Sequence, residues 1–137
     1  MKRHFAILLS IMALVAVCAL PAAAKKKASA DGLSRIEFAE KVYDFGVITD
    51  TGGPVTHEFE FTNAGDGNLL ILKATAECGC TRPEYPEKPV APGKSGKIKV
   101  TFNPAGRSGG FEKVVTVTTN GKPRKTPIKI RGTIRTK

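Results

Sequence analysis

An alternating run decides the fold: residues 55–62 read VTHEFEFT. Its odd-numbered positions are apolar apart from His57, and its even-numbered positions are polar. Successive side chains of a β-strand point to opposite faces, so this pattern predicts a strand with one buried face. The same period recurs in KIKVTF at 97–102 and in IKIRGTIR at 128–135. The three runs therefore predict strands that cover a common apolar core.

Two further apolar runs extend the pattern. Residues 114–119 are rich in β-branched side chains, and residues 69–72 are apolar on both faces, as expected of a central strand. Turn sequences separate the runs, namely NAGDGN at 63–68, Pro92-Gly93, NPAG at 103–106 and Asn120-Gly121. Residues 82–92 hold four prolines and are predicted to form a rigid surface crossover instead of a central strand. The sequence thus predicts an all-β sandwich of about seven strands.

The first 24 residues have the pattern of a secretory signal peptide. Lys2 and Arg3 precede an apolar run over 5–20, and Pro21 leads into three alanines. Cleavage before Lys25 is predicted, with a second small-residue site at 28–30, and an uncleaved membrane anchor is the alternative. We expect a signal peptide over 1–24, a flexible tether over 25–35 and one sandwich domain over 36–135. The mature protein is then periplasmic or secreted, with no membrane span after cleavage.

Cys78 and Cys80 are the cysteines of the mature chain, and three interpretations of them stay open. A disulfide would close a loop of three residues, which stabilises by only about 1.6 kcal/mol, and residues i and i+2 of a strand lie near the outer limit of disulfide geometry. Two thiolates would suit Cu(I), although both methionines lie in the signal segment. Partly buried thiols that pack as small apolar side chains are the third interpretation. A cofactor, Cu(I), is expected only under the second.

His57 is the only histidine of the mature chain. It shares a face with Phe59 and Phe61, so we interpret it as a core or edge-of-core side chain instead of a ligand. No Ser/His/Asp catalytic set is predicted around this one histidine. The residues therefore predict no catalytic site.

Positive charge is concentrated late in the chain. The net charge is +10, and residues 97–137 hold 11 Lys and Arg but one acidic residue, Glu112. Five cations alternate with apolar residues and must point to solvent: Lys97, Lys99, Lys129, Arg131 and Arg135. If their two strands share a sheet, they form one positive face that binds polyanions weakly, with no base-specific binding of nucleic acid. A soluble surface whose edge strands are protected by lysines is the alternative.

Several short motifs together resemble a known family. They are Tyr43-Asp44-Phe45-Gly46, Phe59-x-Phe61-x-Asn63-x-Gly65, Cys78-Gly79-Cys80-Thr81, Pro92-Gly93, Phe111-x-Lys113 and Ile128-x-Ile130-x-Gly132. The series, from Ile36 to Ile134, resembles the family called domain of unknown function 1573. The resemblance implies an immunoglobulin-like β-sandwich, related in shape to modules that bind other proteins, and it implies no established activity. At Cys78 and Cys80 alone, the chain also looks like a copper-delivery protein of respiratory oxidase assembly.

These observations predict an exported, non-enzymatic Ig-like module with a binding or structural role. Its expected partner is another protein of the cell envelope or of the extracellular space. The alternative is an envelope protein whose Cys78 and Cys80 are redox-active or bind Cu(I).

Overall fold

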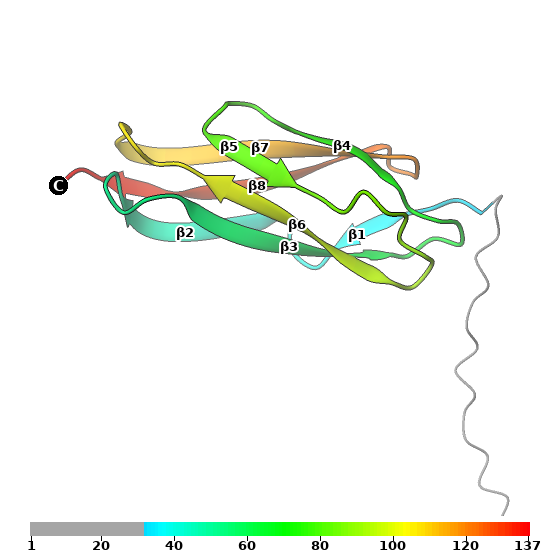
Figure 1. The fold of residues 1–137 in the computed structure, drawn as a ribbon. Helices are drawn as coiled ribbons and strands as arrows, with labels where there is room; N and C mark the ends of the chain where they lie inside the picture. Colours follow the sequence, from blue (N-terminus) through cyan, green and yellow to red (C-terminus); the bar gives the residue numbers. More distant parts are fainter. Residues whose placement is uncertain (1–31) are drawn as a thin grey trace, which may run out of the picture.

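A computed structural model describes residues 32–137 and shows a sandwich of two four-stranded β-sheets (Figure 1). The strands are β1 (Ile36–Phe38), β2 (Val42–Thr49), β3 (Val55–Asn63), β4 (Ile71–Ala76), β5 (Thr81–Glu84), β6 (Ser95–Phe102), β7 (Gly109–Thr119) and β8 (Lys125–Arg135). Residues 32–137 contain no helix able to span a membrane. The predicted signal peptide, its cleavage sites and most of the predicted tether lie outside the described residues.

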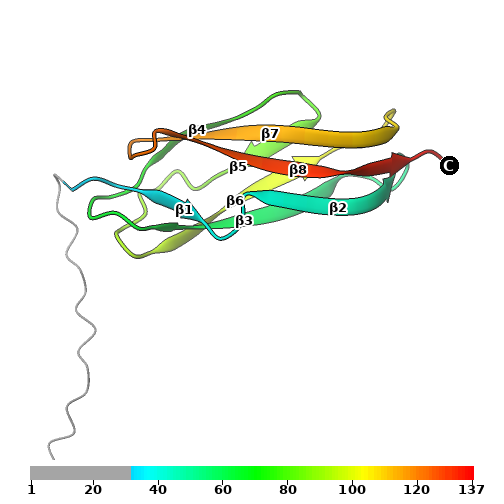
Figure 2. The same ribbon diagram turned by 180° about the vertical axis from the view of Figure 1, so that it is seen from behind.

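One sheet has the strand order β1-β3-β6-β5 and the other has the order β2-β8-β7-β4 (Figure 2). β2 runs parallel to β8, whereas the other neighbouring strands are antiparallel. Between Phe38 and Val42 the chain passes from the first sheet to the second, so its leading segment supplies an edge strand to each sheet. Because this segment forms two strands, the structure has eight strands in residues 32–137, where the sequence predicted about seven.

The residues predicted to face inward form the core. In β3, Phe59 and Phe61 are 0% and 1% exposed, and polar residues alternate with them on the outer face. The other strands contribute Ile98, Val100, Phe102, Val115, Val117, Ile128 and Ile130, all buried. The Phe102 ring stacks on Phe111 of β7 with the ring centroids 4.2 Å apart. The predicted all-β sandwich is confirmed.

Residues 69–72 do not form a central strand, so that prediction was wrong. β4 begins at Ile71 and lies at the edge of its sheet, where Leu72 is 43% exposed. Leu69 is buried but forms an isolated bridge with Val90. A run that is apolar on both faces can therefore combine a buried residue outside the strand, Leu69, with an exposed residue of an edge strand, Leu72.

The proline-rich segment 82–92 avoids the centre of the sheets, as predicted, but its start is paired. β5 is an edge strand of four residues that pairs with β6, and Pro83 lies opposite Val100. An edge strand tolerates proline because one side of it has no ladder to complete. Beyond Glu84 the segment crosses to the start of β6.

One end of the sandwich is fixed by the buried side chain of Asn63, the last residue of β3. Its Nδ2 donates hydrogen bonds to the carbonyl oxygens of Gly67 (2.7 Å) and Val90 (2.9 Å). Its Oδ1 accepts from the backbone N–H groups of Gly65 (3.0 Å) and Arg35 (3.3 Å). A single side chain thus connects the N-terminal segment, the loop after β3 and the loop before β6.

Residues 33–35, inside the predicted tether, are held against the domain. The backbone N–H of Lys122 donates to the Ser34 carbonyl at 3.0 Å, and Ser34 is 3% exposed. Gly121 allows this approach, because a Cβ there would collide with the Ser34 carbonyl. The contacts of the domain therefore begin before β1.

Candidate functional site

Cys78 and Cys80 lie in the tight turn between β4 and β5 and form a disulfide, with their Cα atoms 5.3 Å apart. The backbone N–H of Cys80 donates to the Cys78 sulfur at 3.3 Å. The Cys80 carbonyl accepts from the N–H of Asn103 at 2.9 Å, which fixes the turn to the loop after β6. Cys80 also packs against the core, whereas Gly79 is exposed with open space around it. Both cysteines are thus half-buried, and the disulfide is accessible on the side of Gly79.

A metal site at this turn would have two sulfur ligands at most. Within residues 32–137, no group of three or more His, Cys, Asp and Glu side chains is placed to hold a metal ion. The two sulfurs would also have to be reduced before either could act as a thiolate ligand. Cu(I) binding by Cys78 and Cys80 stays a prediction.

His57 lies at the edge of the core, as predicted. Its ring stacks on Tyr43 of β2 with the centroids 3.5 Å apart and packs edge-on to Phe59 at 4.8 Å. Its Nε2 lies 2.5 Å from Glu40 Oε1, in the segment between β1 and β2. Because β2 and β3 belong to different sheets, this stack closes the open side of the sandwich. These contacts indicate that His57 holds the two sheets together.

The five cations predicted to form one positive face lie on opposite faces of the molecule. Lys97 and Lys99 project from β6, whereas Lys129, Arg131 and Arg135 project from β8 in the other sheet. The single face depended on the two strands sharing a sheet, and they do not. Sequence alternation fixes which residues point outward, but it does not say to which sheet a strand belongs.

Four of these cations are paired with carboxylates from neighbouring strands. The distances are 2.9 Å for Lys97–Glu58, 3.7 Å for Lys99–Glu84, 2.9 Å for Lys129–Glu112 and 3.0 Å for Arg131–Asp44. The hydrogen bond and charge of Lys97 lower the pKa of the Glu58 carboxyl, and the same contact raises the pKa of Lys97. Such exposed pairs contribute little to stability, but they balance the charge of both sheet faces locally.

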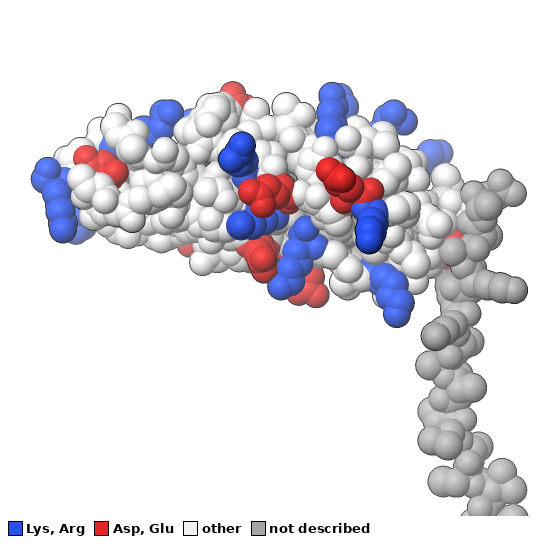
Figure 3. All heavy atoms as spheres, in the orientation of Figure 1, with Lys and Arg blue, Asp and Glu red and all other residues white. Residues whose placement is uncertain are grey.

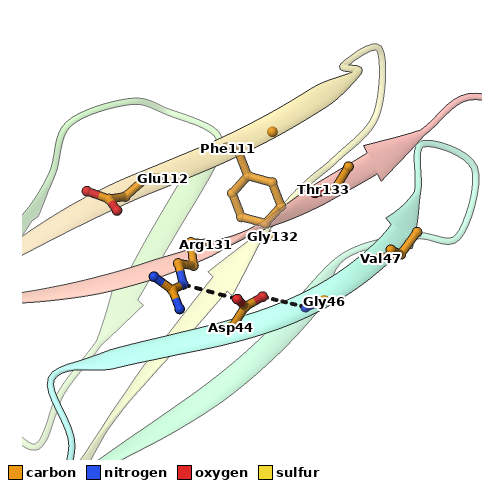
Figure 4. A pocket seen from close by; sticks show the side chains of 9 residues that line it. Asp44, Gly46, Val47, Phe111, Glu112, Arg131, Gly132 and Thr133 are labelled. Carbon is orange, nitrogen blue, oxygen red and sulfur yellow. Dashed lines mark hydrogen bonds and ion pairs between the residues drawn. The ribbon is translucent and has the colours of Figure 1, made fainter.

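A hollow opens on the outer face of β2, β8 and β7 (Figure 4). Its rim is formed by the outward side chains of Asp44, Val47, Glu112, Arg131 and Thr133, and its floor by Gly46, Gly110, Gly132 and Phe111. Arg131 Nε donates a hydrogen bond to Asp44 Oδ2 at 3.0 Å, and the backbone N–H of Gly46 donates one to Asp44 Oδ1 at 2.7 Å. The charged rim is therefore internally paired, and the floor is uncharged.

Three glycines make the floor for different reasons. The β2–β8 register shifts between Asp44 and Val47, and Gly46 takes φ = 68° in this bulge, which favours glycine. At Gly132 a Cβ would lie 2.9 Å from the Gly46 carbonyl oxygen and from the Phe111 ring. At Gly110 no atom lies within 4 Å of a Cβ position, so this glycine leaves the hollow open without being required by packing.

Sequence reasoning did not find the hollow. Its floor is assembled from β2, β7 and β8, and no local run of sequence joins them. The signal was present only in the family motifs, which contain Gly46 and Gly132.

A family described as a protein of unknown function, DUF1573, matches residues 36–134. The chain belongs to this family. The DUF1573 match begins with β1 and ends within β8, so it covers the whole sandwich. The resemblance seen in the sequence motifs is confirmed. No curated protein matches the chain significantly.

Solved structures show what this DUF1573 domain is similar to in fold. A protein of unknown function from Porphyromonas gingivalis W83 has a TM-score of 0.66 and 16% identity over 80% of this chain and 51% of that chain. The PapD-like domain 7 of human CEP192 has a TM-score of 0.55 and 14% identity over 77% of this chain and 88% of that domain. The YadV chaperone has a TM-score of 0.52 and 14% identity, over 72% of this chain and 51% of that chain. The chain thus spans about half of the first and third of these proteins.

Proposed function

We propose that this domain is a non-enzymatic binding module that holds a protein of the cell envelope at the hollow on β2, β8 and β7. The observation that carries the proposal is the glycine floor beside a free strand edge. Within residues 32–137, β2 pairs with β8 on one side only, and its Val47 is 56% exposed at the rim. An unpaired strand edge offers backbone donors and acceptors to an extended segment of another chain.

The chemistry of the hollow defines the segment that fits it. Asp44 and Glu112 are already paired with Arg131 and Lys129, so the rim presents little free charge. The floor of the hollow exposes the backbone of its glycines and the Phe111 ring, and there is open space above Gly110. An extended, uncharged segment with an apolar side chain directed into the hollow would be complementary to it. The similarity in fold to the YadV chaperone and to the PapD-like domain of CEP192 supports a protein partner.

The test fills the hollow without disturbing the fold. Gly110→Trp places a large side chain where no atom lies within 4 Å of the Cβ position. Thr56→Trp is the matched control, on the exposed outer face of the other sheet. A photo-crosslinking residue at Val47 should capture a protein in intact cells, and Gly110→Trp should abolish this product while Thr56→Trp should not. Capture that survives Gly110→Trp would contradict the proposal.

Export to the periplasm or the cell exterior belongs to the same proposal. The predicted signal peptide over 1–24 supports it. The intact mass of the protein from the envelope fraction should correspond to a chain that starts at Lys25. A chain that retains Met1 would favour the membrane anchor.

A second function, thiol–disulfide exchange, is favoured by the accessible disulfide at Cys78 and Cys80. In this reaction a partner dithiol passes two electrons and two protons to the bond, so the partner becomes a disulfide and both cysteines become thiols. Repeated oxidation of a dithiol peptide, with its disulfide as product, would support it, provided that an added oxidant such as oxidised glutathione restores the pair. Cys78→Ser/Cys80→Ser must lose this activity, and capture at Val47 should not change.

A further inference from the structure

Four cations that the sequence did not single out gather at the β7–β8 turn and the start of β4. The basic patch consists of Lys73, Lys122, Arg124 and Lys125, all exposed. The strand register places Lys73 and Lys125 on either side of Thr118, so both project from the same outer face. Figure 3 shows blue side chains along this edge of the molecule, near the end where the described chain begins, with no red between them.

The patch differs from the predicted positive face because its charges are not balanced. None of its four cations forms an ion pair with a carboxylate of residues 32–137. One carboxylate, Asp66, borders it beside Lys122. Four positive charges beside one negative charge leave the basic patch positive.

The turn that carries the patch is held firmly. Asn120 Oδ1 accepts from the N–H of Leu70 at 2.8 Å and from Ser34 Oγ at 3.0 Å. Asn120 Nδ2 donates to the Asn68 carbonyl at 3.0 Å. These bonds fix the turn to the loop before β4 and to the N-terminal segment. The cations are therefore presented on a preformed surface.

Two exposed leucines adjoin the patch. Leu33 is 64% exposed and lines the same depression as Lys122, and Leu72 is 43% exposed beside Lys73. Apolar side chains next to cations are typical of protein surfaces that rest on lipid headgroups. A single-stranded nucleic acid would instead call for exposed aromatic rings, and the four exposed large apolar residues of the described chain are Leu33, Val42, Val47 and Leu72.

The position of the N-terminal end of the described chain also supports a lipid partner. The described residues start at this end, and the sequence just before them contains three successive lysines, 25–27. We propose that the basic patch, with Leu33 and Leu72, rests on a membrane surface that contains anionic lipids. The hollow on β2, β8 and β7 lies toward the opposite end, where β8 finishes, so it would face away from the bilayer.

The test uses the absence of tryptophan from the chain. Leu33→Trp in the full chain introduces one fluorophore at the proposed contact. When phosphatidylcholine vesicles that contain phosphatidylglycerol are added, the tryptophan emission should shift to the blue. The affinity of the protein for these vesicles should exceed its affinity for vesicles of pure phosphatidylcholine by about tenfold or more. The apolar segment over 5–20 would bind both vesicle types, so the difference between them reports the charged contact.

Two charge reversals in the Leu33→Trp background identify the residues responsible. Lys73→Glu/Lys122→Glu/Lys125→Glu should remove most of the preference for anionic vesicles. The control Lys97→Glu/Lys99→Glu/Arg131→Glu changes the net charge equally, at ion-paired sites on the sheet faces, and should retain the preference. Equal losses in both variants would overturn the proposal, and so would an unchanged preference in the first. Stronger retention by heparin than by anionic vesicles, without a blue shift, would assign the patch to soluble polyanions and overturn it as well.

Discussion

Asn63→Ala tests whether one buried side chain holds an end of the sandwich together. The substitution removes two donors from the Gly67 and Val90 carbonyls and one acceptor from the N–H groups of Gly65 and Arg35. A buried polar group left without a partner costs about 1 to 3 kcal/mol. The Gly67 carbonyl loses its bond at a fully buried site, whereas the Val90 carbonyl still accepts a bond from the N–H of Leu69 at 2.9 Å, and water can reach the partly buried N–H groups. We therefore expect a loss of about 2 to 3 kcal/mol, a substantial fraction of the stability of a typical domain.

Urea unfolding followed by far-ultraviolet circular dichroism measures this loss. Asn103→Ala is the matched control, because Asn103 Oδ1 accepts a single exposed bond from the N–H of Ala105 at 3.1 Å. It should cost less than about 1 kcal/mol. If Asn63→Ala costs as little as Asn103→Ala, the reasoning fails.

Asn63→Asp adds a dependence on pH. Its carboxylate would face the Gly67 and Val90 carbonyl oxygens in place of the amide donors. Burial and these oxygens would raise the pKa of the carboxyl, so the folded variant would bind a proton more tightly than the unfolded chain. The stability of the variant relative to wild type should therefore rise as the pH falls. A relative stability that does not change between neutral and acidic pH would contradict this.

Three further predictions follow from the contacts. Gly121→Ala should cost about 1 to 3 kcal/mol in urea unfolding, because its Cβ would collide with the Ser34 carbonyl, whereas Gly110→Ala should change stability by less than about 0.5 kcal/mol; similar values for the two would refute the packing argument. Lys97→Met should raise the pKa of Glu58 toward its ordinary value in an NMR titration, since Lys97 lowers it. The wild-type pair should therefore stabilise the protein above the pKa that Glu58 has in the unfolded chain, and lose this effect as the pH falls through the folded pKa; an unshifted Glu58 titration would contradict it. Cys78→Ser/Cys80→Ser should stay folded and lose about 1.6 kcal/mol from loop closure, and failure to fold would show a larger structural role.

β3, β6 and β8 were predictable because each is encoded in its own side-chain alternation. Phe59, Phe61 and Ile98 are buried where the two-residue period placed them, and this period does not depend on the partner strand. Residues 69–72 were misassigned because an apolar run does not show where a strand begins. Leu69 is buried through a bridge to Val90, which is distant in sequence.

The functional surfaces were less predictable because they depend on how strands are assigned to sheets. Lys97 and Arg131 point outward as expected, yet they lie in different sheets and each has a carboxylate partner from another strand. The basic patch arises from the register of Lys73 and Lys125 across β7, which local sequence does not specify. The cysteine motif was visible in the sequence, and its oxidation state was one of the alternatives left open.

The parallel pairing of β2 with β8 has a mechanical consequence. The described chain starts at one end of the sandwich and finishes at the other (Figure 1). The pairing extends from the bond between Lys129 N and Lys41 O to the bond between Asp50 N and Arg135 O. Tension applied between the two ends would slide these strands past each other, so their hydrogen bonds would bear the load together instead of opening one at a time. A domain tethered at its N-terminal end and pulled by a partner near its C-terminal end is thereby loaded in shear, the direction in which a strand pair resists force best.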